Sequence, residues 1–258
     1  MTGKTMKCAA ASLVMSSALL ASNANAVFMY NVAGPDEASA IAGEQAFLGM
    51  LQSGSLVQEG FEGTLAGTQQ TAFTTSVGTF TGVTPGFDSG SGGGSGACDD
   101  MGYSCAGGLA VLNDATTPFS GRFAAPEGAE NNNWLDSMDY DVMRFDVIGG
   151  KNAIGFFMTD PNDQGGRMDV GLSSGESHSL DLIDIFGGKE SNQSVFYLSF
   201  WSEYDFTSLV FTANNKNDGY GIDNVTVARV PEPATLGLLG AGLLGLGMAA
   251  RRRSAMNG

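Results

Sequence analysis

Short apolar runs, broken at close intervals by glycine, asparagine, aspartate and proline, constrain the fold of this chain more than any other feature. From residue 56 onward such breaks recur about every ten residues, and this spacing is typical of a sandwich or barrel of short strands. Several of the runs carry β-branched or aromatic residues at alternate positions. The predicted strands span residues 78–83, 109–112, 140–147, 153–158, 167–172, 194–201, 209–213 and 221–227.

The segment ending at Val147 shows which kind of sheet to expect. Met143, Phe145 and Val147 alternate with Arg144 and Asp146, so one face of the strand is apolar and the other charged. A half-buried antiparallel strand has this alternation. The sequence therefore predicts an all-β fold, an antiparallel β-sandwich of two stacked sheets.

One helix is expected before the strands, within residues 36–52. Asp36 is a suitable N-cap, and Ile41, Phe47, Leu48 and Leu51 follow at helical spacing. A capping residue ahead of a periodic apolar stripe is the usual signal for a helix start. The sequence predicts one short N-terminal helix here.

The charge of the chain excludes one class of partner. The formal net charge is -15, with 12 Lys and Arg against 27 Asp and Glu, and only seven of the basic residues lie between Val27 and Val230. Nucleic-acid binding needs a basic surface that neutralises phosphates, and none is present. Divalent cations or neutral polymers are better partners.

The N-terminal end has the composition of a targeting segment. Lys4 and Lys7 precede an apolar run over residues 9–20, and the small residues Ala24 and Ala26 follow it. These are the parts of a secretory signal peptide. We expect residues 1–26 to be removed by signal peptidase.

The C-terminal end has three parts: a glutamate between prolines, an uncharged stretch over 234–250, and an arginine cluster. The residues are Pro231, Glu232, Pro233, Arg251, Arg252 and Arg253. Seventeen residues at ~1.5 Å each make a helix of about 25 Å, within the range that spans a bilayer. Arginines beyond it stay cytoplasmic, and prolines before it leave an extended backbone accessible to a protease. A single C-terminal transmembrane helix is therefore predicted.

This tail resembles the PEP-CTERM sorting signal, which its family presents to a membrane-embedded protease called exosortase. The resemblance implies a Gram-negative host that makes extracellular polysaccharide, a transient inner-membrane anchor, and a final place at the cell surface or in the biofilm matrix. The expected division is a signal peptide (1–26), an N-terminal segment with the helix (27–55), the sandwich (56–230) and the sorting signal (231–258).

Two cysteines lie beside a Gly- and Ser-rich stretch over residues 88–96. Cys98 and Cys105 are close in sequence, and in an exported protein such a pair is expected to form a disulfide, worth about 2 to 3 kcal/mol. A metal or redox role fits less well because the spacing is not Cys-x-x-Cys and the single histidine, His178, is distant in sequence.

A second resemblance concerns the first and last parts of the β region. Phe61-Glu62-Gly63 and the segment around Asp223 are similar to the opening and closing strands of jelly-roll domains related to carbohydrate-binding modules. In that family two such acidic residues often share a structural calcium ion, which implies Glu62 and Asp223 as ligands here. The alternative is that both residues only flank turns.

No catalytic motif accompanies His178. We therefore expect a non-enzymatic surface or matrix protein associated with extracellular polysaccharide. Two alternatives stay open. One is a carbohydrate-binding lectin in which Trp134, next to the polar run 131–133, stacks against a sugar ring. The other is a secreted glycoside hydrolase with a carboxylate pair.

Overall fold

The alternation predicted around Phe145 is present in the structure. In the strand β8 (Val142–Val147), Met143 and Phe145 are buried, and Arg144 and Asp146 form an ion pair on the outer face, with Nη2 and Oδ1 2.6 Å apart. The computed structural model describes residues 27–52, 54–85, 102–104, 107–119, 121–126, 132–161, 165–188, 193–214 and 219–230.

The larger of two sheets has the strand order β1-β12-β9-β14-β7-β6-β3, and β2 also pairs with β14. All its pairings are antiparallel. Its strands are β1 (Phe28–Ala33), β2 (Val57–Glu59), β3 (Thr68–Gln70), β6 (Leu109–Asn113), β7 (Asn133–Asp136), β9 (Ala153–Thr159), β12 (Val195–Ser202) and β14 (Gly221–Ala228).

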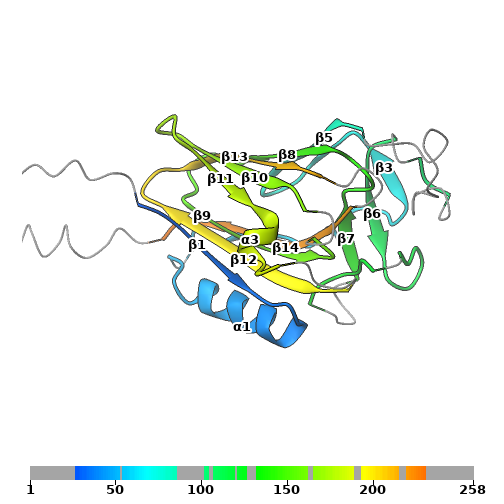
Figure 1. The fold of residues 1–258 in the computed structure, drawn as a ribbon, viewed down its shortest axis with the longest axis horizontal. Coiled ribbons are helices and arrows are strands. Elements are labelled where there is room, and N and C mark those ends of the chain that lie inside the picture. Colours follow the sequence, from blue (N-terminus) through cyan, green and yellow to red (C-terminus); the bar gives the residue numbers. More distant parts are fainter. Residues whose placement is uncertain are drawn as a thin grey trace, which may run out of the picture.

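The smaller sheet has the order β11-β10-β13-β8-β5-β4, again antiparallel throughout. Besides β8 it contains β4 (Ala72–Thr74), β5 (Gly78–Thr84), β10 (Arg167–Leu172), β11 (Ser177–Asp181) and β13 (Phe206–Thr212). The two sheets lie face to face (Figure 1). This arrangement confirms the prediction of an antiparallel β-sandwich.

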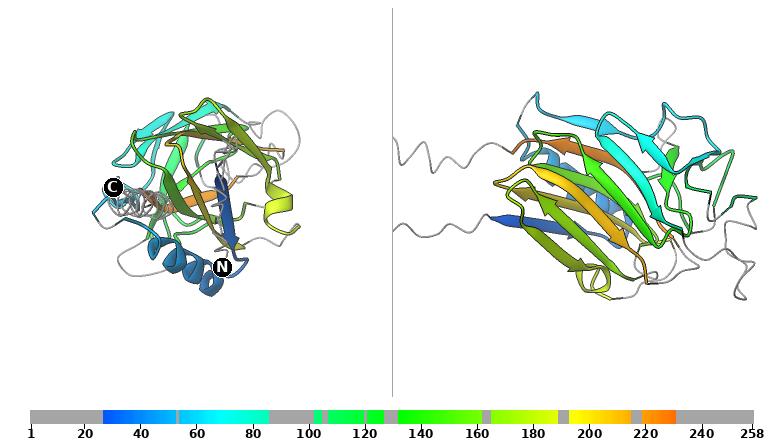
Figure 2. Two further views of the ribbon diagram at one scale, coloured as in Figure 1. Left: turned by 90° about the vertical axis from the view of Figure 1, so that its left-hand side faces the viewer. Right: turned by 90° about the horizontal axis from the view of Figure 1, so that it is seen from above.

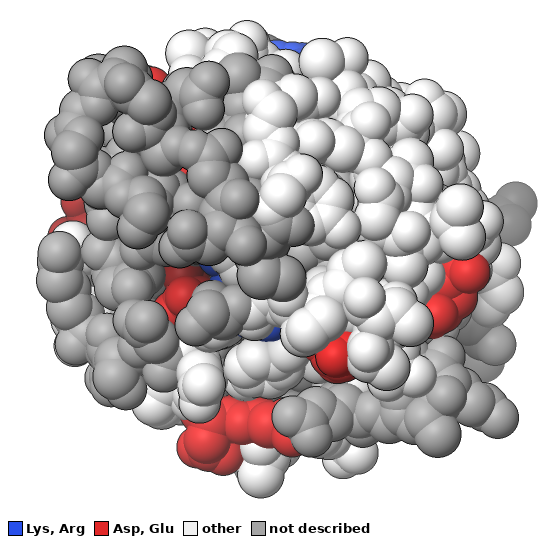
Figure 3. All heavy atoms as spheres, turned by 90° about the vertical axis from the view of Figure 1, so that its right-hand side faces the viewer, with Lys and Arg blue, Asp and Glu red and all other residues white. Residues whose placement is uncertain are grey.

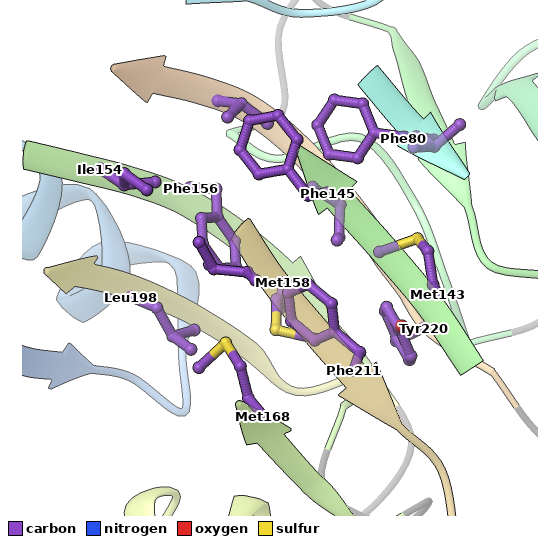
Figure 4. Packing of buried hydrophobic residues seen from close by; sticks show 14 of the residues in the cluster. Phe80, Met143, Phe145, Ile154, Phe156, Met158, Met168, Leu198, Phe211 and Tyr220 are labelled. Atoms are coloured by element: carbon purple, nitrogen blue, oxygen red, sulfur yellow. The ribbon is translucent and has the colours of Figure 1, made fainter. Parts of the chain in front are cut away.

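The core fills the space between the sheets (Figure 4). Phe80 and Phe145 from the smaller sheet stack with centroids 4.2 Å apart, and Phe156 from the larger sheet meets Phe211 edge to face at 6.0 Å. Full burial of such a side chain stabilises the fold by about 1.5 to 3 kcal/mol. The core therefore joins strands that are far apart in sequence.

A helix covers part of the outer face of the larger sheet (Figure 1). Helix α1 (Glu37–Leu48) begins after Asp36, whose side chain accepts a hydrogen bond from the Ser39 amide at 2.9 Å. Its Phe47 packs against Tyr197 of β12 and lies over Gly155 of β9, where a Cβ would come within 2.7 Å of the Phe47 ring. Glycine at this position allows the helix to approach the sheet, so β9 is buried on both faces.

A second, very short helix, α3 (Leu182–Ile185), follows β11. Next to it in the chain, His178 of β11 stacks on Phe28 of β1, with ring centroids 4.2 Å apart and planes 7° from parallel. This contact joins the edge strands of the two sheets. The histidine therefore serves packing.

Both ends of the described chain leave the sandwich at the same end (Figures 1 and 2). Phe28 is paired with Ser202, and the Asn152 side chain donates to the Ser202 carbonyl at 3.0 Å and accepts from the Val230 amide at 2.8 Å. One asparagine thus links the region where β1 begins with the region where β14 ends. We call this the terminal end of the sandwich, and the opposite end the distal end.

All eight predicted strands and the predicted helix are present, with bounds shifted by at most a few residues. The strands β1, β2, β3, β4, β7 and β11 were not predicted; β1 comes from the N-terminal segment 27–55 and forms an edge of the larger sheet. In the part of the chain that the structure describes, no helix is long and apolar enough to cross a bilayer. The predicted signal peptide (1–26) and the transmembrane helix over 234–250 lie outside those residues.

Candidate functional site

A buried ion pair at the distal end joins the segment after β6 to the end of β7. Arg122 donates from Nη1 to Oδ1 of Asp136 at 2.8 Å, and its Nη2 lies 3.9 Å from Asp139. The Arg122 side chain is 2% exposed and that of Asp136 0%. The guanidinium also lies over the Phe119 ring, 4.5 Å from its centroid. Burial raises the pKa of Asp136 and the positive charge of Arg122 acts against this rise, so each charge depends on the other.

Glu62, one of the two predicted calcium ligands, holds main-chain groups at this end. Its Oε1 accepts hydrogen bonds from the amides of Asn132 and Asn133, at 2.8 and 2.9 Å. Asn133 returns a bond from its own side chain to the Phe61 carbonyl at 3.2 Å. The carboxylate therefore fixes the start of β7 against the turn after β2.

Asp223, the other predicted ligand, and Asp114 fix a neighbouring loop. Oδ2 of Asp223 accepts from the Ala125 amide at 3.0 Å and Oδ1 from the Asn224 amide at 2.6 Å. Both oxygens of Asp114 accept from the Ala124 amide, at 3.1 and 3.3 Å. Carboxylates from β14 and from the end of β6 thus hold adjacent amides of one segment.

The charges of these carboxylates act on one another. Burial raises the pKa of Asp223 well above its usual value, and the negative charges of Glu62 and Asp114 raise it further. Glu62 is therefore close enough to Asp223 for their charges to interact, and so is Asp114, which was not predicted.

The donor atoms fit calcium in type and charge, because calcium takes oxygen ligands and would offset the repulsion. Among the described residues, however, no group of three or more His, Cys, Asp or Glu side chains has the geometry to hold a metal ion. The carboxylates instead bond main-chain amides in this structure. Calcium at Glu62 and Asp223 therefore stays a hypothesis.

The backbone is strained beside one of the predicted ligands. Phe61, next to Glu62, has φ 60°, and a bulky residue such as phenylalanine rarely adopts this left-handed region. Asn224, next to Asp223, has φ 47°, which asparagine adopts more readily. Strained residues such as Phe61 concentrate at functional sites, so Phe61 and the interacting carboxylates mark the distal end as the candidate site.

A hollow of about 620 Å³ opens at this end. It is lined by Asp114, Pro118, Phe119, Gly121, Arg122, Phe123, Asn132 and Gln193. Figure 3 looks onto the distal end, and on the described part of this face it shows more acidic than basic surface. The volume falls within the range of small-molecule pockets.

The expectation that Trp134 is exposed for sugar stacking is wrong. Its side chain is 0% exposed and packs with Leu112, Phe119 and Met138, and its indole N–H donates to Asp136 at 3.3 Å. Trp134 lies in β7, where both faces are covered. The polar run before it had suggested exposure, but Asn133, the last residue of that run, is the buried first residue of the strand.

Several predicted residues lie outside the described part of the chain. They are Cys98, Cys105, Pro231, Glu232, Pro233, Arg251, Arg252 and Arg253. The buried Arg122 and Asp136 were missed by sequence reasoning. A lone arginine between Phe119 and the apolar run Phe123-Ala124-Ala125 was the available signal, because a charge in such surroundings needs a partner.

A family model described as the PEP-CTERM protein-sorting motif matches residues 229–253. The chain carries a PEP-CTERM sorting motif. The motif begins directly after β14, which ends at Ala228. It implies that an exosortase processes the chain and that the protein is exported, processed at the membrane and placed at the cell surface.

Comparison with solved structures gives a likeness to the K2 cleaved adhesin domain of Lys-gingipain, at 12% identity and a TM-score of 0.36, over 68% of this chain and 100% of that one. A TM-score this low supports no conclusion about the fold or function of this protein. No curated protein matches the chain. The PEP-CTERM motif is therefore the basis for the functional conclusion.

Proposed function

We propose that this protein is a non-enzymatic surface or matrix protein that works outside the cell in association with extracellular polysaccharide. The observation that carries the proposal is the sorting motif at residues 229–253. In this account signal peptidase removes residues 1–26, the stretch 234–250 holds the chain in the inner membrane, and exosortase then processes it near Glu232.

The positions of the two chain ends determine how the sandwich is oriented while it is anchored in the membrane. Because β1 begins and β14 ends at the terminal end, a sandwich anchored through residues 234–250 has that end toward the membrane. The distal end, with the hollow and the interacting carboxylates, then faces away from it. A protein that acts on material outside the cell benefits from this orientation.

Two observations support a role without catalysis. His178, the single histidine, stacks against Phe28, so its ring is engaged in packing rather than placed in the hollow. The carboxylates of Glu62, Asp114 and Asp223 bond main-chain amides. Carboxylates that hold main-chain amides in place are compatible with a binding or matrix protein.

The proposal is tested by following the protein in a host with and without exosortase. With exosortase we expect a shortened protein in the extracellular polysaccharide fraction. Without it, or with Glu232→Ala, we expect a full-length chain that stays in the membrane fraction. An exposed residue of the sandwich, changed as Glu203→Ala, serves as the control and should be sorted normally. Equal extracellular amounts in both hosts would contradict the proposal.

We also propose a structural calcium ion held by Glu62 and Asp223. The supporting observation is that burial and the neighbouring charges of Glu62 and Asp114 oppose ionisation of Asp223. A divalent cation would reverse this effect and stabilise the charged form. The proposal concerns stability only, and no chemical step depends on the ion.

A further inference from the structure

We propose that the hollow at the distal end binds a neutral sugar unit, through Asp114, Asn132 and Gln193 as hydrogen-bonding groups and Phe123 as an apolar wall. The inference rests on the proposed association with polysaccharide and gives it a site. Trp134 has no part in this site because its side chain is buried.

The hollow is large enough to hold a sugar. The hollow measures about 620 Å³, which is enough for one or two sugar rings and is well inside the usual range for ligand pockets. It is open toward solvent. A chain of sugars could therefore place one unit inside and continue outward.

The polar groups are suited to hydroxyls. A hydroxyl both donates and accepts hydrogen bonds. The amides of Asn132 and Gln193 offer both functions, and the carboxylate of Asp114 offers strong acceptors. Asp114 is held in place by the Ala124 amide at 3.1 Å. The set therefore matches a ligand with several adjacent hydroxyl groups.

The charges of the walls favour a neutral ligand. Arg122 lines the hollow, but its charge is paired with that of Asp136 at 2.8 Å, and Asp114 adds a carboxylate to the same wall. The described wall thus carries charges of both signs, so neither an anionic nor a cationic ligand gains a clear advantage.

The backbone of Gln193, which lines the hollow, has an unusual conformation. Its backbone has φ 75°, outside the range that residues with a side chain normally adopt. It precedes Ser194 and β12, which pairs with β9. Thr159 at the end of β9 donates to the Phe123 carbonyl at 3.4 Å. The two sides of the hollow are thus connected through the sheet.

The test uses residues 27–230, which contain every described strand of both sheets and the core. The ¹⁵N-labelled protein is titrated with methyl α-mannopyranoside, methyl β-galactopyranoside and methyl β-glucopyranoside, and with methyl β-glucuronide as the anionic comparison. We expect at least one neutral glycoside to shift amide signals around Gly121 and Gln193, and the glucuronide to bind more weakly.

Glycoside binding by single-residue variants shows whether the ligand occupies the hollow. Asp114→Asn and Gln193→Ala should each weaken binding, Asp114→Asn by tenfold or more, which is about 1.4 kcal/mol. Asp205→Asn, at the terminal end, should bind as the unchanged protein does. Unchanged melting temperatures show that the variants are folded.

The inference is overturned if no neutral glycoside shifts these signals, if the shifts lie at the terminal end, or if the glucuronide binds more tightly. These outcomes are separate from the test of the proposed function. A protein that is still sorted by exosortase into the polysaccharide fraction, but binds no glycoside, keeps the proposed function and loses this site.

Discussion

The two ends of the sandwich are built from different interactions. At the terminal end the contacts are ordinary: Asn152 bonds main-chain groups, and the Arg229–Asp205 ion pair, 3.2 Å apart, has side chains that are 48% and 34% exposed. At the distal end the Arg122–Asp136 pair is buried and Asp223 is surrounded by other carboxylates. Burying charge in this way costs stability, so the difference indicates that the distal end is shaped for something besides folding.

The largest expected effect comes from breaking the buried pair. Arg122→Met leaves the Asp136 carboxylate buried without its positively charged partner, so we expect a loss of about 3 to 5 kcal/mol in the free energy of unfolding. The matched change at the terminal end, Arg229→Met, removes an exposed pair and should cost about 1 kcal/mol or less. Urea unfolding measures both. Similar losses at the two ends would remove the contrast between them.

The next effect concerns calcium. If Glu62 and Asp223 hold the ion, a concentration 100 times the dissociation constant stabilises the protein by about 2.7 kcal/mol. We therefore expect calcium to raise the melting temperature over that in chelator, and Glu62→Ala and Asp223→Ala each to abolish the rise. Asp205→Ala, at the terminal end, should keep it. Identical calorimetric melts with calcium and with chelator would remove the ion site.

The smallest effect is a pH dependence measured in chelator. The pKa of Asp223 is raised above its ordinary value of 3.8, so the folded protein holds this proton more tightly than the unfolded chain does. Its contribution to stability is complete below the ordinary value and is lost as the pH rises through the raised pKa.

Asp223→Asn cannot ionise, so its stability should fall less steeply than that of the unchanged protein between about pH 4 and pH 8. Asp205→Asn should leave the slope as it is. Urea unfolding across this range measures the slopes. Parallel curves for the unchanged protein and Asp223→Asn would show that burial does not perturb this carboxyl.

The sandwich could be predicted because each of its central strands has a local pattern of apolar residues that is typical of a strand. Residues such as Phe145 and Phe156 lie in runs whose period or apolar content matches a strand. The strands that were missed are short, like β2 and β3, or polar on their exposed face, like β11 (Ser177–Asp181). Their pairing depends on partners distant in sequence, which local patterns do not reveal.

The distal site could be predicted only in part. The resemblance to jelly-roll domains named Glu62 and Asp223, whose charges interact in the structure, but it did not name Asp114, whose charge also acts on Asp223. Trp134 was placed wrongly because burial of an indole depends on residues distant in sequence: Leu112 of the neighbouring strand lies beside it, and Phe119 and Ala124 belong to the same buried cluster. The partners of Arg122 were not predictable, since Asp136 comes from a strand that the sequence did not indicate.

Export and processing at both ends can be read from the intact mass of the mature protein isolated from its host. We expect a chain that begins at Val27 and ends near Glu232, without the arginine cluster Arg251 to Arg253. A mature protein that keeps residues 1–26, or that keeps the arginine cluster in a host with active exosortase, would contradict it.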